Sequence, residues 1–333
     1  MAHTCAIYEG VAYCWGANDL GQLGDGTTGA HAVPTRVQLP EGTIDELTTG
    51  ERDGCAIVDA RLYCWGDAFQ ATPAQVVLSG PVTSVALGED FACAIANETY
   101  CWGVNDVGQL GDGTNAPRAT PTRVQGALHA RLYAGEDHVC ALKVAGGVEC
   151  WGHNDHGMLG FGSFTPEVVM LPQAVDPVIT VLPSIGGTSA CAIENSAVMC
   201  WGANADGELG DGSGMRSATP QIVPGLPAAA SITTGGSPTK SDASCAIDLM
   251  GAIRCWGLGD YGRLGQGAAS SSPVPVDVGG LPGPAVRTAI GEDHACAQLA
   301  DGDLWCWGRG TSGQLGDGNA SSSLTPVRVI PPS

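Results

Sequence analysis

The tripeptide Cys-Trp-Gly occurs seven times in this 333-residue chain, and its recurrence constrains the fold more than any other feature. The seven copies begin at Cys14, Cys64, Cys101, Cys150, Cys200, Cys255 and Cys306. Successive copies are 50, 37, 49, 50, 55 and 51 residues apart, so one unit of similar length repeats along the sequence. We therefore expect residues 1–333 to form a single domain of seven units, although length alone would suggest two domains.

Each unit has the pattern of four short strands. After Cys-Trp-Gly comes a glycine-rich loop such as GANDLGQLGDGT (16–27), and a proline then introduces a short alternating run such as PTRV at Pro34. A further run such as VTSVALG (82–88) leads to the next cysteine. Four strands separated by turn residues, at a period near 50, are typical of a propeller blade. The sequence predicts an all-β, seven-bladed β-propeller.

The two ends of the chain interrupt this pattern. The VTSVALG-like strand occurs six times against seven copies of the other elements, and the chain begins directly at HTCAI. We predict that the ring closes when the C-terminal strand PVRVI joins the N-terminal hairpin in one shared, three-stranded blade, so that no sheet edge is left bare. A start in the middle of a blade also suggests that the natural chain begins further upstream.

A second cysteine precedes each Cys-Trp-Gly and completes seven pairs. A hairpin centred on Glu9-Gly10 places Cys5 opposite Cys14 in a non-hydrogen-bonded pair, where Cα atoms approach to about 4.5 Å, within reach of a disulfide. Cys93 and Cys101 are one residue closer in sequence, which calls for a bulge or a strained bridge. We predict seven hairpin disulfides, with free buried thiols and metal ligands as the alternatives. The pairs are Cys5–Cys14, Cys55–Cys64, Cys93–Cys101, Cys140–Cys150, Cys191–Cys200, Cys245–Cys255 and Cys296–Cys306.

The cysteine count also indicates a compartment. Disulfides at this density persist outside the reducing cytosol, so we expect a secreted, periplasmic or cell-surface protein. The N-terminal residues MAHTCAIYEG have neither the cationic nor the apolar segment of an export signal, and no apolar run approaches the roughly 18 residues of a membrane helix. The 34 acidic and 14 basic residues give this acidic protein a net charge of −20, which argues against a nucleic-acid partner.

The repeated motifs resemble a known family. Gly-x-x-His-x-Cys-Ala, then Tyr-Cys-Trp-Gly-x-Asn-x-x-Gly-Gln-Leu-Gly-Asp-Gly, then Pro-x-x-Val is similar to the regulator of chromosome condensation repeat, in the cysteine-paired form of bacterial alpha-tubulin-suppressor-like proteins. The resemblance spans the chain and implies the propeller fold. Family members include an exchange factor for a small GTPase, an ultraviolet-B photoreceptor and a beta-lactamase inhibitor. The insertion, basic segments and Gly-Trp-Arg-His-Thr repeats linked to the family's exchange, chromatin-binding and photoreceptor activities are absent here, so none of these activities is expected.

The tryptophan after each second cysteine points to the opposite face of its sheet from that cysteine. A ring of this size is suited to packing against the neighbouring blade, and we prefer that role to a photochemical or ligand-stacking one. The residues are Trp15, Trp65, Trp102, Trp151, Trp201, Trp256 and Trp307.

A Gly-Glu-Asp motif recurs just before the first cysteine of several units. Propeller symmetry would place these loops in a ring on one face, where clustered carboxylates attract a cation or a basic partner. The competing interpretation is that the Asp and His side chains cap their own turns. The candidate binding residues are Glu51, Asp53, Glu89, Asp90, Glu136, Asp137, His138, Glu292, Asp293 and His294.

The remaining loops give weaker signals. Those around Asn18 and Asn105 lack the regular spacing of a calcium site and are interpreted as turns around a buried leucine. The leucines are Leu23, Leu110, Leu159, Leu209, Leu264 and Leu315. No cofactor is expected, and calcium is the one ion considered. The loop GDAFQATPAQ (66–75) is shortened and GGSPTKSDASC (235–245) is enlarged, so a partner surface is expected to differ most in blades 2 and 6.

No nucleophile elbow, phosphate loop or zinc-protease motif is present in the sequence. The leading hypothesis is a non-enzymatic interaction scaffold that binds a protein or glycan through loops on one propeller face. The alternative is an enzyme or divalent-cation-binding protein that uses carboxylates around the axis, namely Glu89, Asp90, Glu136, Asp137, Glu292 and Asp293. A third hypothesis is self-association, in which the three-stranded blade recruits a strand from a neighbouring molecule.

Overall fold

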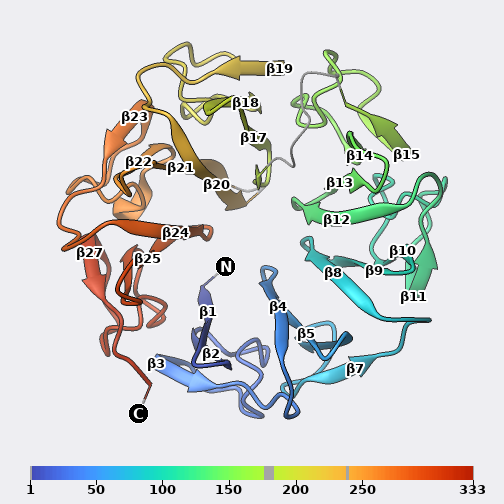
Figure 1. Ribbon diagram of the computed structural model, residues 1–333, viewed down its shortest axis with the longest axis horizontal. Helices are drawn as coiled ribbons and strands as arrows, with labels where there is room; N and C mark the ends of the chain where they lie inside the picture. The colour runs from blue at the N-terminus through green and yellow to red at the C-terminus, as the bar shows by residue number, and fades with distance from the viewer. Residues whose placement is uncertain (1, 176–183, 238–239, 333) are drawn as a thin grey trace.

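The computed structural model, which describes residues 2–175, 184–237 and 240–332, is a ring of seven antiparallel sheets around a central axis (Figure 1). This confirms the predicted seven-bladed all-β propeller. Six sheets have four strands and the first has three. In each four-stranded blade the first strand lies nearest the axis and the fourth lies at the rim.

The strands are short, and most contain six residues, as the sequence pattern predicts. Blade 1 contains β1 (His3–Tyr8), β2 (Val11–Gly16) and β3 (His31–Arg36), and blade 2 contains β4 (Ile44–Thr49), β5 (Asp53–Val58), β6 (Arg61–Gly66) and β7 (Ala74–Val76). Blade 3 contains β8 (Val82–Leu87), β9 (Phe91–Ala96), β10 (Glu98–Gly103) and β11 (Arg118–Arg123), and blade 4 contains β12 (His129–Ala134), β13 (His138–Lys143), β14 (Val148–His153) and β15 (Val168–Ala174).

The second half of the chain repeats this arrangement. Blade 5 contains β16 (Ser184–Ile185), β17 (Ser189–Glu194), β18 (Ala197–Gly202) and β19 (Ser217–Ile222), and blade 6 contains β20 (Ala229–Ser237), β21 (Lys240–Asp248), β22 (Ile253–Gly257) and β23 (Ser272–Asp277). Blade 7 contains β24 (Ala285–Ile290), β25 (His294–Leu299), β26 (Leu304–Gly308) and β27 (Ser323–Arg328). A short 3-10 turn, η1 (Asp260–Gly262), is the one helical segment of the described residues.

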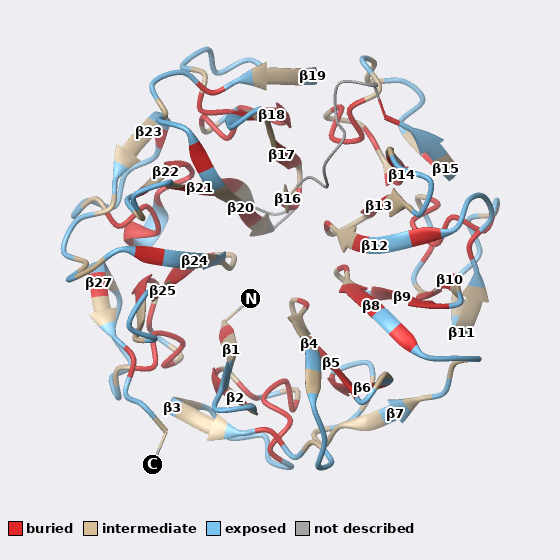
Figure 2. Ribbon diagram, in the orientation of Figure 1, coloured by how far each residue is buried: buried red, intermediate tan, exposed pale blue. Residues whose placement is uncertain are grey.

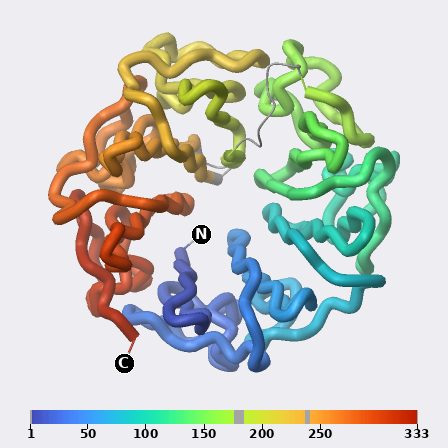
Figure 3. The backbone as a smooth tube through the Cα atoms, viewed as in Figure 1, coloured from blue at the N-terminus to red at the C-terminus, as the bar shows by residue number. Residues whose placement is uncertain are grey.

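The predicted mode of ring closure is wrong in one respect. The C-terminal strand β27 pairs with β26 and completes blade 7, so it does not share a blade with the N-terminal hairpin. The three-stranded blade is formed by β1, β2 and β3 alone, with the N-terminus near the axis and the C-terminus at the rim (Figure 3). The physical reason is that the loop after β26 leads the chain back beside β26, as the matching loop does in the other blades.

All seven hairpin disulfides are present, with Cα–Cα distances of 4.0 to 4.1 Å. The turn of the first hairpin is Glu9-Gly10, and both residues have positive φ, as a two-residue hairpin turn requires. The exceptional pair Cys93 and Cys101 needs no bulge. Instead, the turn consists of the single residue Asn97, whose φ is 66°. The two cysteines therefore remain directly opposite each other.

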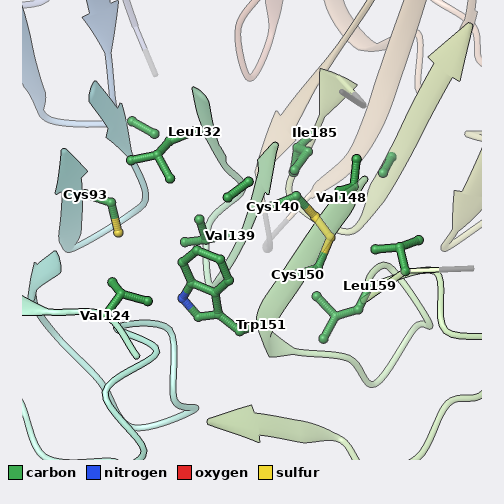
Figure 4. Close-up of a cluster of buried hydrophobic side chains, with 14 of the residues drawn as sticks. Cys93, Val124, Leu132, Val139, Cys140, Val148, Cys150, Trp151, Leu159 and Ile185 are labelled. Atoms are coloured by element: carbon green, nitrogen blue, oxygen red, sulfur yellow. A yellow bond between two sulfur atoms is a disulfide. The ribbon is translucent and has the colours of Figure 1, made fainter. Parts of the chain in front are cut away.

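The repeated tryptophans form contacts between blades, as the sequence predicts. Trp151 is fully buried and its Nε1 donates to the carbonyl of Gln109 in the preceding blade, at 2.9 Å. Figure 4 shows the Trp151 ring beside Val124 and Val139, near the disulfide of Cys140. Bonds of the same kind, at 2.8 to 3.0 Å, are donated by Trp15, Trp65, Trp201, Trp256 and Trp307.

The glycine-rich loops are held by their own polar groups. The side-chain oxygen of Asn18 accepts from the N–H of Leu23, and its Nδ2 donates to Asp25 and to the carbonyl of Gly29. Leu23 and its five counterparts are completely buried, which confirms the prediction of turns around a leucine. Figure 2 shows that the buried segments gather in the middle of each blade, whereas the outer strands are mostly intermediate or exposed.

Candidate functional site at the axial mouth

The Gly-Glu-Asp loops lie where the innermost strand of a blade turns into the second strand. Gly88 follows β8 and Gly135 follows β12, so both loops are at the same end of their strands. The N–H of Glu89 donates to the carbonyl of Glu136 at 3.1 Å, which joins the loops of blades 3 and 4. Symmetry thus brings these loops together on one face, around the opening of the axis (Figure 1).

A cavity of about 240 Å³ occupies this opening, which we call the axial mouth. Blades 2 to 7 all contribute residues to its wall, chiefly from β4, β8 and β12 and the glycines that follow the inner strands. The acidic residues in its lining are Glu46, Glu51, Glu89 and Glu136. Arg131 is the one cation in the wall, among the described residues, and its guanidinium lies 3.6 Å from the carboxylate of Glu46.

The glutamates of the axial mouth repel one another. Burial, followed by the charges of Asp242 and Glu89, raises the pKa of Glu136 to about 9, so this side chain is largely protonated at neutral pH. Burial and the charge of Glu51 also raise the pKa of Glu89. A positive group entering the mouth would favour the ionised form of both carboxyls. The wall of the axial mouth therefore carries four glutamates, two of them with raised pKa values, against one arginine among the described residues.

The aspartates of the same motif have other surroundings. None of them lies in the described lining of the axial mouth. Asp53 accepts from the N–H of Ala68, although burial raises its pKa to about 6. Burial also raises the pKa of Asp137. Asp293 is 2% exposed and forms an ion pair with Arg309 at 3.0 Å.

Both motif histidines lie in the interior of their blades. Burial lowers the pKa of His138 to about 3 and that of His294 to about 4, so both imidazoles are neutral at physiological pH. The His294 Nε2 lies 2.8 Å from the hydroxyl of Thr4 in blade 1. The His138 ring packs on Gly135, where a Cβ would come within 2.3 Å of the imidazole. This contact explains why glycine begins the motif.

Three residues of this face were not predicted from the sequence. Arg131 and Glu46 lie within inner strands and belong to no loop motif, so nothing in the repeat marked them. Asp242 is fully buried and accepts from the backbone N–H groups of Gly187, Thr188 and Ser189 at 2.7 to 3.0 Å. Aligning blade 6 on its Trp-Gly would have placed Asp242 in register with Asp293, because Ala243 pairs with Gly257 as His294 pairs with Gly308.

The two irregular blades differ from their neighbours as structures. In blade 2 the outer strand β7 contains only three residues. In blade 6, β20 and β21 each contain nine residues, and pairing continues as far as Ser237 with Lys240. Both strands are therefore longer than their counterparts in the other blades, and residues 238 and 239 of the enlarged loop lie outside the described residues.

In the part of the chain that the structure describes, no three His, Cys, Asp or Glu side chains are grouped as metal ligands. No described helix has the length and apolarity needed to cross a membrane.

Comparison with known proteins gives one consistent family. The family model for the regulator of chromosome condensation (RCC1) repeat matches residues 9–50, 97–142, 251–298 and 301–333, just over half of the chain. Human E3 ubiquitin-protein ligase HERC2 is 28% identical over 96% of the chain, which spans only 7% of that protein. The ultraviolet-B receptor UVR8 of Arabidopsis thaliana is 27% identical over 98% of the chain and 68% of the receptor.

Solved structures agree with this result. Prp20p from Saccharomyces cerevisiae superposes with a TM-score of 0.82 at 20% identity, over 98% of this chain and 87% of its own. The structure of Prp20p is described together with its binding to Gsp1p and histones. At this identity the likeness establishes the propeller fold and leaves the ligands of the present chain open.

Proposed function

The chain belongs to the regulator of chromosome condensation repeat family, and we propose that it is a non-enzymatic protein-interaction scaffold whose axial mouth binds a basic segment of a partner protein. The family connection supports the general role, since Prp20p is described as a binder of Gsp1p and histones. The choice of a basic partner comes from the chemistry of this chain alone.

The observation that carries the proposal is the convergence of three glutamates from consecutive blades. Glu51, Glu89 and Glu136 line one cavity, and burial together with their mutual repulsion raises the pKa of the latter two. A lysine or arginine side chain inserted there would relieve this repulsion and gain charge-assisted hydrogen bonds. The long strands β20 and β21 supply an adjoining surface that differs from that of the other blades among the described residues.

We further propose that the scaffold works outside the reducing cytosol, at a cell surface or as a secreted or periplasmic protein. The support is the use of all 14 cysteines in seven bridges. The acidic net charge of −20 would favour basic partners at long range and keep the surface soluble.

Calorimetric titration with a lysine-rich peptide tests the proposal, and the same peptide with acetylated lysines provides the control. We expect binding that weakens with salt and falls by about thirtyfold in the double variant Glu89→Gln, Glu136→Gln, because each of the two lost charge contacts contributes on the order of 1 kcal/mol. The variant Glu41→Gln, in the exposed loop between β3 and β4, is the matched control. Equal binding of the acetylated peptide would contradict the proposal.

The same carboxylates suit a divalent cation, which is the alternative role. Titration with calcium separates the two, because a metal site would bind calcium with about 1:1 stoichiometry in the absence of any peptide. We expect no saturable calcium binding. If a glycan binds and basic peptides do not, the partner is a glycan and not a protein.

A further inference from the structure

A polar cavity of about 370 Å³ in blade 5 is lined by the loop after β14, the loop after β18 and residues of neighbouring elements. Glu208 and Arg216 contribute from the loop after β18, Thr188 from the loop between β16 and β17, and Ser241 from β21. This cavity shares no lining residue with the axial mouth. The chain therefore has a second concave site, which we call the blade 5 cavity.

In blades 1 and 3 the corresponding part of the glycine-rich loop is filled by an aspartate and a glutamine three residues later. Gln22 Oε1 accepts from the backbone N–H two residues earlier at 2.9 Å, and its Nε2 donates to Asp19 at 3.2 Å. Gln109 forms the same two bonds in blade 3, the second of them to Asp106 at 3.3 Å. Both ends of each amide therefore have a partner.

Blade 5 replaces both members of this pair. Its loop GANADGELGDG (202–212) aligns with GANDLGQLGDG (16–26), so Ala205 stands at the position of the aspartate and Glu208 at that of the glutamine. Glu208 Oε2 keeps the first bond, because it accepts from the N–H of Asp206 at 2.8 Å. The second bond is lost, since alanine has no side-chain acceptor and a carboxylate has no N–H to donate.

The other oxygen of Glu208 is a buried acceptor without a donor. Glu208 is 1% exposed, and its Oε1 has no hydrogen-bond partner among the described residues. The Ser241 hydroxyl in the same wall donates its single proton to Asp206, so it does not serve Glu208. Burial of an unpaired carboxylate oxygen is unfavourable unless a group in the cavity donates to it. The negative charge of this acceptor favours an ammonium group as the donor.

The wall of the blade 5 cavity also contains a positive charge. Arg216 Nη1 donates to the carbonyl of Asp155 at 3.0 Å, and its guanidinium lies 4.4 Å from the centre of the Phe164 ring. Among residues 2–175, 184–237 and 240–332, no carboxylate pairs with this guanidinium. Its remaining N–H groups are suited to a carboxylate, which a guanidinium binds through two parallel hydrogen bonds. The cavity thus offers an acceptor and a donor of opposite charge.

We propose that the blade 5 cavity binds a free amino acid, whose ammonium group donates to Glu208 and whose carboxylate accepts from Arg216. Both ends of the molecule are needed, because an amine alone leaves Arg216 without a counterion and an anion alone leaves Glu208 without a donor. A volume of about 370 Å³ is within the range of small-molecule sites and leaves space for a side chain. This site is separate from the axial mouth, and it does not depend on the proposed function.

Thermal unfolding with each of the common L-amino acids at about 10 mM identifies the ligand, because a molecule that binds only the folded state raises the melting temperature. Calorimetric titration with the amino acid that gives the largest rise then measures its affinity, and we expect 1:1 stoichiometry. The N-acetylated form and the methyl ester of this amino acid each lack one of the two charges, and each should bind at least about tenfold more weakly. If no amino acid raises the melting temperature, the proposal is wrong.

Variants that restore the side chains of the other blades locate the site. Glu208→Gln introduces the residue that blades 1 and 3 have at this position, so we expect it to fold. It should weaken amino-acid binding at least about tenfold, because the amide lacks the negative charge. The double variant Ala205→Asp, Glu208→Gln restores the whole pair and should abolish binding. A cooperative thermal transition of each variant without ligand verifies folding.

Two further variants complete the test. Arg216→Gln should weaken binding of the amino acid and leave the weaker binding of its methyl ester unchanged, because the ester has no carboxylate for the guanidinium. Glu41→Gln, in the exposed loop between β3 and β4, is the matched control and should bind the amino acid as the native protein does. Glu136→Gln should also bind normally, so this proposal and the proposed function of the axial mouth fail separately.

Three results would overturn the assignment. Amino-acid binding that Glu208→Gln leaves intact would place the ligand elsewhere in the protein. Equal binding of the N-acetylated form would show that no ammonium group is recognised. Calcium binding that Glu208→Gln abolishes, with no amino acid bound, would assign the carboxylates of the blade 5 cavity to a metal ion.

Discussion

The indole Nε1 of Trp151 donates a hydrogen bond to the backbone carbonyl of Gln109, which lies one blade earlier and 2.9 Å away. Six of the seven repeated tryptophans form this bond across a blade junction. Within residues 2–175, 184–237 and 240–332, Trp102 forms none, because the shortened loop of blade 2 brings no equivalent carbonyl to it. Trp102 is accordingly 8% exposed, whereas Trp151 is fully buried.

This difference predicts unequal costs for the same substitution. Trp151→Phe leaves the buried Gln109 carbonyl without its donor and should lower the free energy of unfolding by about 1 to 3 kcal/mol beyond the loss of ring volume. Trp102→Phe loses only ring volume. It should therefore lower the free energy of unfolding by about 1 to 3 kcal/mol less than Trp151→Phe does. Urea denaturation of both variants measures the difference, and equal costs would show that the bond between blades contributes nothing.

The hairpin bridges make a second prediction, on the covalent state and stability. Mass measurement of the native and reduced protein should differ by two hydrogens per bridge, with no thiol open to alkylation before reduction. Removing one bridge in a Cys55→Ser, Cys64→Ser variant should lower the free energy of unfolding by about 2 to 3 kcal/mol, as expected for a loop of about ten residues. Free thiols in the native protein would remove the support for an extracytoplasmic setting.

Buried histidines predict a specific loss of stability in acid. The pKa of His138 is about 3 in the fold and 6.5 when exposed, so the unfolded chain binds a proton that the folded protein does not. The contribution of neutral His138 to the free energy of unfolding is complete above pH 6.5 and is lost as the pH falls toward 3. In blade 3 the equivalent position is Phe91, which packs on Gly88 as His138 packs on Gly135.

Exchanging the residues that these two blades have at this position tests the effect of His138 on acid stability. His138→Phe should fold normally and show a smaller fall in melting temperature between pH 7 and pH 4 than the native protein does. The reverse change, Phe91→His, should enlarge that fall. If neither variant alters the acid dependence, His138 is not held neutral by burial.

Glu136 predicts the opposite dependence on pH. Its pKa is about 9 in the fold and 4.5 when exposed, so the folded protein retains a proton that the unfolded chain releases. Stability from this group therefore falls as the pH rises from 4.5 through 9. Glu136→Gln should raise the melting temperature at pH 8 and leave it nearly unchanged at pH 4, and calorimetric scans at both values measure this. A lower melting temperature of Glu136→Gln than of the native protein at pH 8 would contradict the raised pKa of Glu136.

Much of this architecture could be predicted from the sequence because the repeat imposes it. Cys5 and Cys14 specify the register of a hairpin by their spacing alone, and the same register recurs in the other six blades. The tryptophans after the second cysteine face a neighbouring blade because strand residues alternate sides. Local rules with a period of two residues are sufficient for both conclusions.

Other features depend on contacts that the local pattern does not contain. The position of β27 depends on which strand precedes it, so the expected shared blade was wrong although the three-stranded blade was correct. The sequence placed Glu89 and Glu136 near the axis, but it could not distinguish them from Asp137 and Asp293, which lie outside the described lining of the mouth. Arg131 and Asp242 were missed because their roles arise only when several blades meet.

Proton release on binding tests the central claim most directly, that the axial mouth receives a basic segment. Titration of a lysine-rich peptide at pH 8, in two buffers of different ionisation enthalpy, measures protons released per peptide bound. We predict release approaching one proton, because a bound cation favours the ionised form of Glu136, and loss of that release in Glu136→Gln. Binding without proton release, or release that persists in Glu136→Gln, would contradict the account.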